Sequence, residues 1–252
     1  MPGGLDAAPG TRVIFVRHGH VHNPTGVIYG RMPRMRLSEQ GRRDMERTAC
    51  HLAAEQLAAI YTSPLLRARE SAASIARYQP GVPVRRCSWL IEVRTSWQGE
   101  LNKIQDEIEG FSYYDPVKSA DDETILDVFS RMDRALRLAV RRHNGQTVVC
   151  VSHGDPIKIL RIGYSGMELT PQRVRMPDPG QASMLTFHFW HSQALPIISP
   201  VDLGQMERII AGDIRGGAER PGAPRRGEAA ARPELVERHV VRQAHRERLA
   251  SP

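Results

Sequence analysis

The sequence of 252 residues contains only three cysteines, which lie far apart at Cys50, Cys87 and Cys150. Because this odd and scattered set has apolar neighbours, it is typical of reduced thiols and not of a disulfide framework. No apolar run approaches the ~20 residues that a membrane-spanning helix needs, and the first residues lack the pattern of a secretory signal. We therefore expect a cytoplasmic protein with no membrane partner.

Aromatic residues make up only 6% of the sequence, and they do not alternate with basic residues as they do on a stacking platform for nucleic acids. The net charge is +7, but nine arginines and six acidic residues from position 213 onward account for three of these charges. The remaining chain is mildly basic, which favours a small anionic substrate over a nucleic-acid partner. The oligomeric state is expected to be a monomer or a homodimer.

The composition divides the chain into three parts. Residues 1–11 are expected to be a disordered leader, and residues 12–203 are long enough for one domain with a sizeable core. Within that domain, residues 93–121 have a weak periodic pattern and are interpreted as a small cap insertion. Residues 204–252 are rich in Arg, Ala, Gly and Pro, so we expect a basic, disordered C-terminal tail.

Strand and helix patterns alternate along the domain. The expected strands are 13–16, 59–62, 82–87, 147–151, 184–190 and 196–201, the last two forming an edge hairpin. The expected helices begin at Ser38, at Ser63-Pro64, at Asp122 and at Asp155-Pro156. This alternation predicts an α/β fold, a three-layer α/β/α arrangement around a central, mostly parallel sheet.

Polar residues follow three of these strands. The apolar run at 13–16 ends at Arg17 and His18, and Gly19 then permits a sharp turn or a close approach to a ligand. Arg67 follows the second strand in the first turn of a helix, and His153 follows the fourth. At the carboxyl edge of a sheet, two guanidinium groups and two imidazoles form a pocket suited to a phosphoryl group without a metal.

The chain resembles the histidine phosphatase superfamily, which has the phosphoglycerate mutase-like fold. The resemblance covers roughly residues 12–201 and rests on short motifs in the family's order. These are R-H-G at 17–19, Y-G-R followed by L-S-E-Q-G within 29–41, S-P-L-L-R-A-R-E-S-A at 63–72, L-I-E at 90–92, D-E-T at 122–124 and V-S-H-G at 151–154.

The resemblance implies a phosphomonoester hydrolase that acts on a small phosphorylated metabolite through a phosphohistidine. His18 is then the nucleophile, and Glu92 gives a proton to the leaving alcohol and takes one from water. His153 also belongs to the catalytic set. The phosphate-binding groups implied are Arg17, Asn23, Arg67, His153 and Gly154, and neither a cofactor nor a metal is implied.

Three alternatives remain open from the sequence. Alternating histidines at His18, His20 and His22 would suit a metal hydrolase if they lay on one face of a strand. A phosphoglycerate-type phosphomutase is a second alternative, although the short insertion at 93–121 favours access of water. The third is a relative without enzymatic activity that binds phosphorylated ligands.

Overall fold

Six strands form one sheet with the order β3-β2-β4-β1-β5-β6. The computed structural model describes residues 10–115, 117–175, 180–190 and 195–201. The strands are β1 (Thr11–Arg17), β2 (Leu57–Thr62), β3 (Val84–Arg86), β4 (Thr147–Ser152), β5 (Met184–Phe189) and β6 (Ile197–Val201). All six expected strands are confirmed, and no bound shifts by more than two residues.

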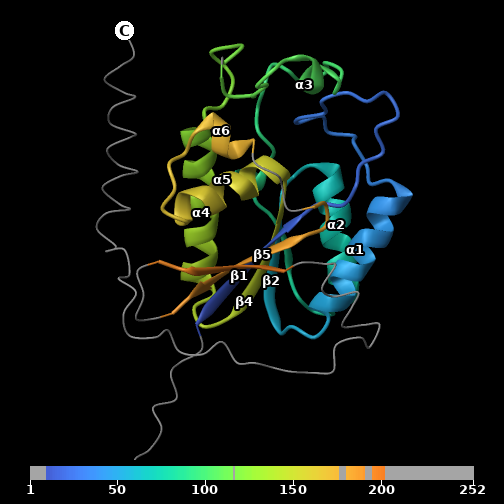
Figure 1. Ribbon diagram of the computed structural model, residues 1–252. Helices are drawn as coiled ribbons and strands as arrows, with labels where there is room; N and C mark the ends of the chain where they lie inside the picture. Colours follow the sequence, from blue (N-terminus) through green and yellow to red (C-terminus); the bar gives the residue numbers. More distant parts are fainter. Residues whose placement is uncertain (1–9, 116, 176–179, 191–194, 202–252) are drawn as a thin grey trace, which may run out of the picture. The chain divides into compact units, whose positions relative to one another are not determined.

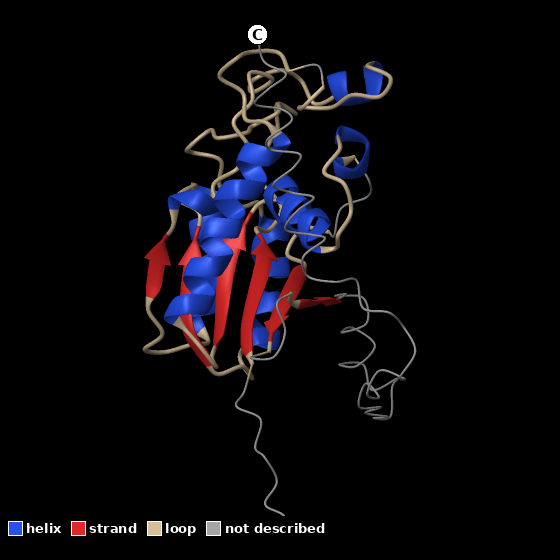
Figure 2. Ribbon diagram, turned by 90° about the vertical axis from the view of Figure 1, so that its left-hand side faces the viewer, coloured by secondary structure: helices blue, strands red, loops and turns tan. Residues whose placement is uncertain are grey.

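The central strands β1 and β4 pair in parallel, with Phe15 opposite Cys150 and Arg17 opposite Ser152. Their interiors are buried, as expected for apolar runs covered on both faces. Strands β2 and β3 are also parallel, whereas β5 runs antiparallel to β1. Figure 2 shows the parallel strands pointing toward the end of the sheet where the long loops lie. The predicted, mostly parallel sheet is confirmed.

Helices cover both faces of the sheet. The helices are α1 (Glu39–Leu52), α2 (Leu66–Arg77), α3 (Ile104–Glu107), α4 (Ile125–Arg142), α5 (Gly154–Tyr164) and α6 (Pro171–Val174), with a short 3-10 helix, η1, at Ser88–Leu90. Helices α1 and α2 lie together on one side of the strands, and α4, α5 and α6 lie on the other (Figure 1). This arrangement confirms the three-layer α/β/α fold.

The starts of α1 and α4 follow from their caps. Ser38 caps α1 as predicted, because its hydroxyl accepts a hydrogen bond from the amide of Gly41 at 3.0 Å. Helix α4 begins three residues later than predicted. Thr124 and Asp127 form a capping box there, whereas the Asp122 carboxylate accepts hydrogen bonds from the amide and hydroxyl of Ser96.

The predicted starts of α2 and α5 are wrong in position. Ser63 does not cap α2, which begins at Leu66, because the Ser63 side chain is buried and contacts His153. Helix α5 begins at Gly154, two residues earlier than the predicted first residue, so Pro156 is its third residue. The first turn of a helix tolerates this proline because its amides have no partner within the helix.

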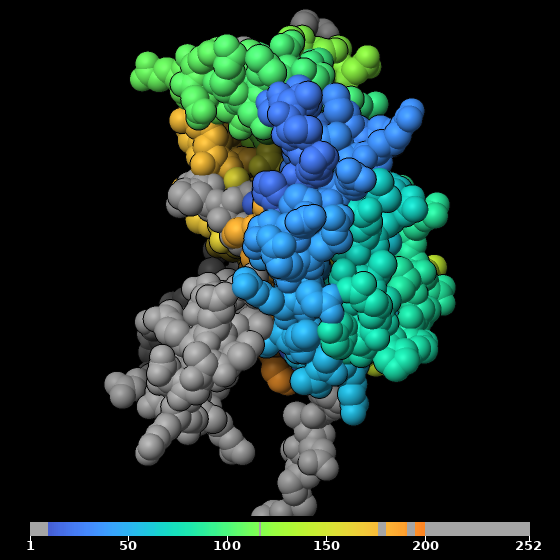
Figure 3. Space-filling view, turned by 90° about the vertical axis from the view of Figure 1, so that its right-hand side faces the viewer, coloured from blue at the N-terminus to red at the C-terminus, as the bar shows by residue number. Residues whose placement is uncertain are grey.

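The insertion at 93–121 lies against the loop that follows β1. The amide of Ile28 donates to the carbonyl of Glu100 (2.7 Å), and the amide of Asn102 donates to the carbonyl of Gly26 (2.6 Å). In Figure 3 the green insertion covers the end of the domain beside the blue loop. The two segments therefore cover the carboxyl edge of the sheet together.

The described residues begin within the predicted leader and end before the predicted tail. Strand β1 begins at Thr11, so the last residue of the predicted leader belongs to the sheet, and residues 1–9 lie outside the described part. The predicted tail at 204–252 also lies outside it. Within the described ranges, no helix is long and apolar enough to cross a membrane.

Candidate active site

The loop after β1 is packed tightly at His18 and Gly19. A Cβ atom on Gly19 would lie 2.4 Å from the carbonyl oxygen of Gly41 in α1, so only glycine fits there. The amide of Gly19 donates to the hydroxyl of Ser71 in α2 at 3.2 Å. The amide of His18 donates to the carbonyl of Ser152 in β4 at 3.1 Å. These contacts hold His18 at the meeting point of β1, β4, α1 and α2.

The imidazole of His18 has a defined orientation. It is 1% exposed, and its Nδ1–H donates to the carbonyl oxygen of Gly19 at 2.8 Å. The Nε2 atom accepts a hydrogen bond from Nε of Arg67 at 3.2 Å. Burial first, and then the positive charge of Arg67, lower the pKa of His18 well below its usual value. The side chain is therefore neutral near pH 7, with a lone pair on Nε2.

Arg67 is a fully buried cation in the first turn of α2. Its Nη2 donates to the carbonyl of Gly30 at 2.6 Å, and its guanidinium lies 4.7 Å from the centre of the Tyr29 ring. Among the described residues, none accepts a hydrogen bond from Nη1 of Arg67. Burial lowers the pKa of Arg67 from its usual value, but an arginine remains charged in proteins. Arg67 thus offers a buried positive charge with a spare donor.

His153 follows β4 and is fully buried beside His18, with ring centres 5.0 Å apart. Its Nε2 lies 2.8 Å from the hydroxyl of Ser63. The same hydroxyl oxygen also accepts a hydrogen bond from the amide of Leu65 at 3.4 Å. No described residue forms a hydrogen bond with Nδ1 of His153. Burial lowers the pKa of His153 well below its usual value.

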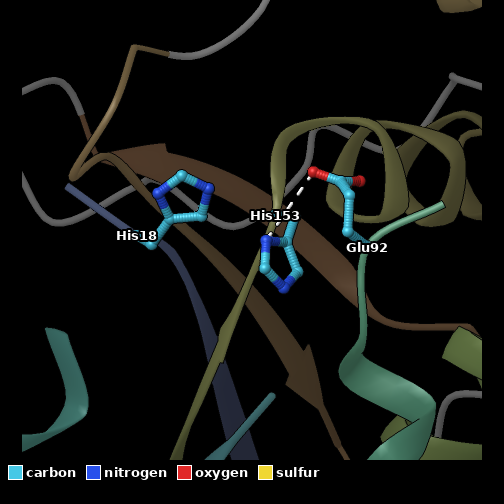
Figure 4. A group of neighbouring side chains, drawn as sticks. All are labelled: His18, Glu92 and His153. Carbon is cyan, nitrogen blue, oxygen red and sulfur yellow. Dashed lines mark ion pairs between the residues drawn. The ribbon is translucent and has the colours of Figure 1, made fainter. Parts of the chain in front are cut away.

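Glu92 reaches the same place from the loop after η1. Its Oε2 lies 3.6 Å from Nδ1 of His153 (Figure 4). The same oxygen lies 3.9 Å from Nη2 of Arg67. Its Oε1 accepts a hydrogen bond from the amide of Val93 at 2.9 Å. Burial, the largest effect, and the charge of Asp155 raise the pKa of Glu92 to about 6, although Arg67 opposes this. Glu92 therefore exchanges protons readily near neutral pH.

Two arginines and one glutamate hold the loop that carries Glu92. Nε of Arg31 donates to the backbone carbonyl of Glu92 at 2.7 Å, and Nη1 of Arg131 donates to that of Ile91 at 2.6 Å. Glu123 pairs with both, at 2.8 Å from Arg31 and 3.0 Å from Arg131. The motifs Y-G-R and D-E-T contain Arg31 and Glu123, but the sequence did not indicate that they meet. Their contacts place Glu92 beside the histidines.

Six of the seven residues singled out from the sequence come together at this site. His18, Arg17, Glu92 and Gly154 line one cavity of about 510 Å³, and the buried Arg67 and His153 contact that lining. Asn23 is not part of the lining. Its side chain forms two hydrogen bonds with the backbone of Val27, so it stabilises its own loop. The expectation that Asn23 binds phosphate is therefore not supported by its position.

The three alternating histidines do not form a metal site. His20 is exposed and its Nδ1 lies 2.8 Å from the hydroxyl of Ser38, while His22 is exposed elsewhere on the loop. Within the described ranges, the group that brings three potential ligand atoms within 4.8 Å of one another is His18, Glu92 and His153. Arg67 donates to His18 Nε2 and lies near Glu92, so its charge opposes a cation there.

Comparisons with known proteins agree with this geometry. The histidine phosphatase superfamily (branch 1) matches residues 13–195. An uncharacterized protein of Mycobacterium tuberculosis, Rv0525, is 36% identical over 164 residues, which cover 63% of this chain and 81% of the relative. Phosphoserine phosphatase 1 of Hydrogenobacter thermophilus is 30% identical over 167 residues, covering 63% of this chain and 78% of the relative.

A similar fold occurs among solved structures. YhfR of Bacillus stearothermophilus superimposes with a TM-score of 0.62 and 27% sequence identity, over 73% of this chain and 96% of YhfR. The family match spans β1 from Val13 onward, all of β2 to β5 and all of the residues that meet at His18. The chain belongs to the histidine phosphatase superfamily, in its branch 1.

Proposed function

We propose that the protein hydrolyses phosphate monoesters of small metabolites through a phosphohistidine at His18. The observation that carries the proposal is the environment of that side chain. A neutral imidazole with its lone pair on Nε2 lies beside a buried arginine with a spare donor and a second histidine with an unpaired Nδ1. This set combines a nucleophile with donors for phosphate oxygens. Membership of the superfamily and the phosphoserine phosphatase relative support the same reaction class.

The first step transfers the phosphoryl group to the enzyme. Nε2 of His18 attacks phosphorus, the bond to the alcohol oxygen breaks, and protonated Glu92 gives its proton to that oxygen. Arg67, Arg17 and His153 donate to the equatorial oxygens, where negative charge is spread in the transition state. For the attack to occur, Nε of Arg67 releases Nε2 of His18, to which it donates in the structure, and donates to a phosphoryl oxygen instead.

The second step returns His18 to its starting state. Ionised Glu92 accepts a proton from water, the water oxygen attacks phosphorus, and the bond between phosphorus and Nε2 breaks to release inorganic phosphate. The cavity beside Glu92 gives water access to the phosphohistidine. The cap supports hydrolysis over mutase activity, because Lys103 and Lys118 pair with Glu107 and Glu100 and do not line the cavity.

Replacing Glu92 with Gln is expected to affect substrates according to their leaving group. The rate of phosphoryl transfer to the enzyme should fall far more with an alkyl phosphate than with an aryl phosphate, because the leaving oxygen of the aryl ester needs little protonation. In the parent enzyme, the rate with the alkyl ester should decrease as the pH rises above about 6, because Glu92 loses its proton there. The variant should lack this decrease. Steady-state rates from pH 5 to 8 with both esters test the prediction.

Trapping experiments provide a second readout for the same variant. Labelled phosphohistidine should accumulate in Glu92→Gln, because no carboxylate activates water in the second step. Glu100→Gln, an exposed acid that pairs with Lys118 in the insertion, is the matched control and should behave as the parent enzyme does. Equal losses on both esters, with no trapped intermediate, would show that another group transfers the proton.

Vanadate should inhibit the enzyme strongly, whereas EDTA should leave its activity unchanged. Vanadate adopts the five-coordinate geometry of in-line transfer, which the donors around His18 are placed to stabilise. The charge of Arg67 beside His18 and Glu92 disfavours a bound cation in the same place. Phosphate release measured with each additive tests both expectations. Activity that EDTA removes and zinc or manganese restores would contradict the proposal.

A further inference from the structure

We propose that the substrate is a neutral, hydroxyl-rich phosphate ester, of the sugar or polyol phosphate class, and that Asp155 selects against a second acidic group. This inference rests on the proposed function, since it concerns the part of the same cavity that lies beyond the phosphoryl group. The cavity of about 510 Å³ is much larger than a phosphate requires and has the size of a small-metabolite pocket.

Asp155 is a fixed carboxylate in the wall of this cavity. It is the second residue of α5, two positions after His153, so it lies close to the phosphoryl site. The hydroxyl of Tyr114 donates to its Oδ2 at 3.0 Å. Burial raises the pKa of Tyr114 well above its usual value, so this donor stays protonated. A carboxylate on the substrate would meet this negative charge at short range.

The nearby cation is already engaged. Lys158 is buried, donates to the carbonyl oxygen of Val174 at 2.7 Å and lies 3.6 Å from Oδ1 of Asp155. Beyond the residues assigned to the phosphoryl site, the charged lining residues within the described ranges are Asp106, Asp155 and Lys158. Since the two acids outnumber the lysine, this part of the cavity has no excess positive charge to neutralise a second acidic group on the substrate.

The remaining wall suits hydroxyl groups. Asn102 and Gln105 bring amide side chains from the insertion, and Thr95 and Tyr113 add hydroxyls. Amides and carboxylates together accept from and donate to vicinal hydroxyls, while the ring of Tyr113 offers an apolar surface for carbon-bound hydrogens. A second cavity of about 190 Å³ shares Gln105, Tyr113, Asp155 and Lys158 with the first, so the polar wall continues past Asp155.

Two pairs of substrates test the proposal in the full-length enzyme. In the first pair, glycerol 3-phosphate has a hydroxymethyl group where 3-phosphoglycerate has a carboxylate. In the second, larger pair, glucose 6-phosphate has no carboxylate and 6-phosphogluconate has one. We expect kcat/KM to favour the neutral member of each pair by at least about ten-fold, as repulsion between nearby like charges requires. Equal values, or a preference for the acids, would overturn the proposal. Preference for phosphoethanolamine over glucose 6-phosphate would also overturn it.

Variants assign the effect to Asp155. In Asp155→Asn, which keeps an acceptor for Tyr114, the preference for the neutral member should fall by at least about five-fold, mainly through a lower KM for the acid. Glu107→Gln removes the same charge from an exposed residue of α3 outside the cavity and should keep the parent preference. An unchanged preference in Asp155→Asn would overturn the assignment. Hydrolysis of p-nitrophenyl phosphate is measured in parallel as a test of the proposed function. If the protein is not a phosphatase, this reaction will be absent too, whereas a wrong substrate proposal will leave it intact.

Discussion

His18→Ala is expected to abolish turnover and phosphoenzyme formation together. The imidazole is the sole group within the described ranges that combines a buried, neutral nitrogen with a guanidinium donor at 3.2 Å, so no neighbour replaces it as a nucleophile. Loss of a covalent nucleophile typically costs several orders of magnitude in kcat, about 10⁶-fold in a serine protease. Steady-state phosphate release and labelling with a ³²P-phosphate ester measure the two effects.

The matched control is His22→Ala, which removes an exposed imidazole from the same loop. It should retain both turnover and labelling. Near-normal activity in His18→Ala would contradict a covalent mechanism through this residue. Labelling that persists in His18→Ala would instead identify another phosphorylated side chain, with His153 the first to test because its ring centre lies 5.0 Å away.

Arg67→Ala is expected to lower kcat/KM by about 10²- to 10³-fold, the range seen when a preorganised donor to a transition state is removed. The loss should be larger than for an exposed cation because the guanidinium is fully buried and its field is weakly screened. Arg67 also lowers the pKa of Glu92. Removing the guanidinium should therefore raise that pKa, and Glu92 should lose its proton at a higher pH than in the parent enzyme. Arg67→Lys should recover part of the rate, since it restores charge without the planar fork.

Arg69→Ala is the control for Arg67→Ala, because Arg69 lies on the same helix but is exposed. It should leave the rate and the pH profile unchanged. Thermal unfolding of both variants separates a local effect from loss of the fold. A folded Arg67→Ala variant with parent activity would show that the buried charge does not contribute to catalysis.

Much of the fold is predictable from the sequence because periodicity and strand ends are local signals. The apolar run at 13–16 and the run at 147–151 both proved to be buried central strands, and each ends at the site. Arg67 was correctly placed in the first turn of α2. These predictions succeeded because the period of the hydrophobic pattern reports burial directly.

The failures involve side chains whose partners are distant in the sequence. Ser63 and Pro64 have the pattern of a helix start, but the hydroxyl of Ser63 instead orients His153, which is 90 positions away. The resemblance implied that Asn23 binds phosphate, yet its side chain forms hydrogen bonds with the backbone of Val27 within its own turn. Tertiary contacts override local preferences in such cases, and no local pattern reports them.

The parallel pairing of β1 with β4 has a consequence for how the chain acquires its activity. His18 and His153 are far apart in the sequence, and they become neighbours when strands separated by more than one hundred positions align, with Arg17 opposite Ser152. Such non-local pairing forms slowly compared with helices. No contiguous fragment shorter than the span from His18 to His153 holds both imidazoles. During synthesis, His18, the proposed nucleophile, therefore leaves the ribosome long before His153, and we expect the chain to stay inactive until β4 is inserted into the sheet.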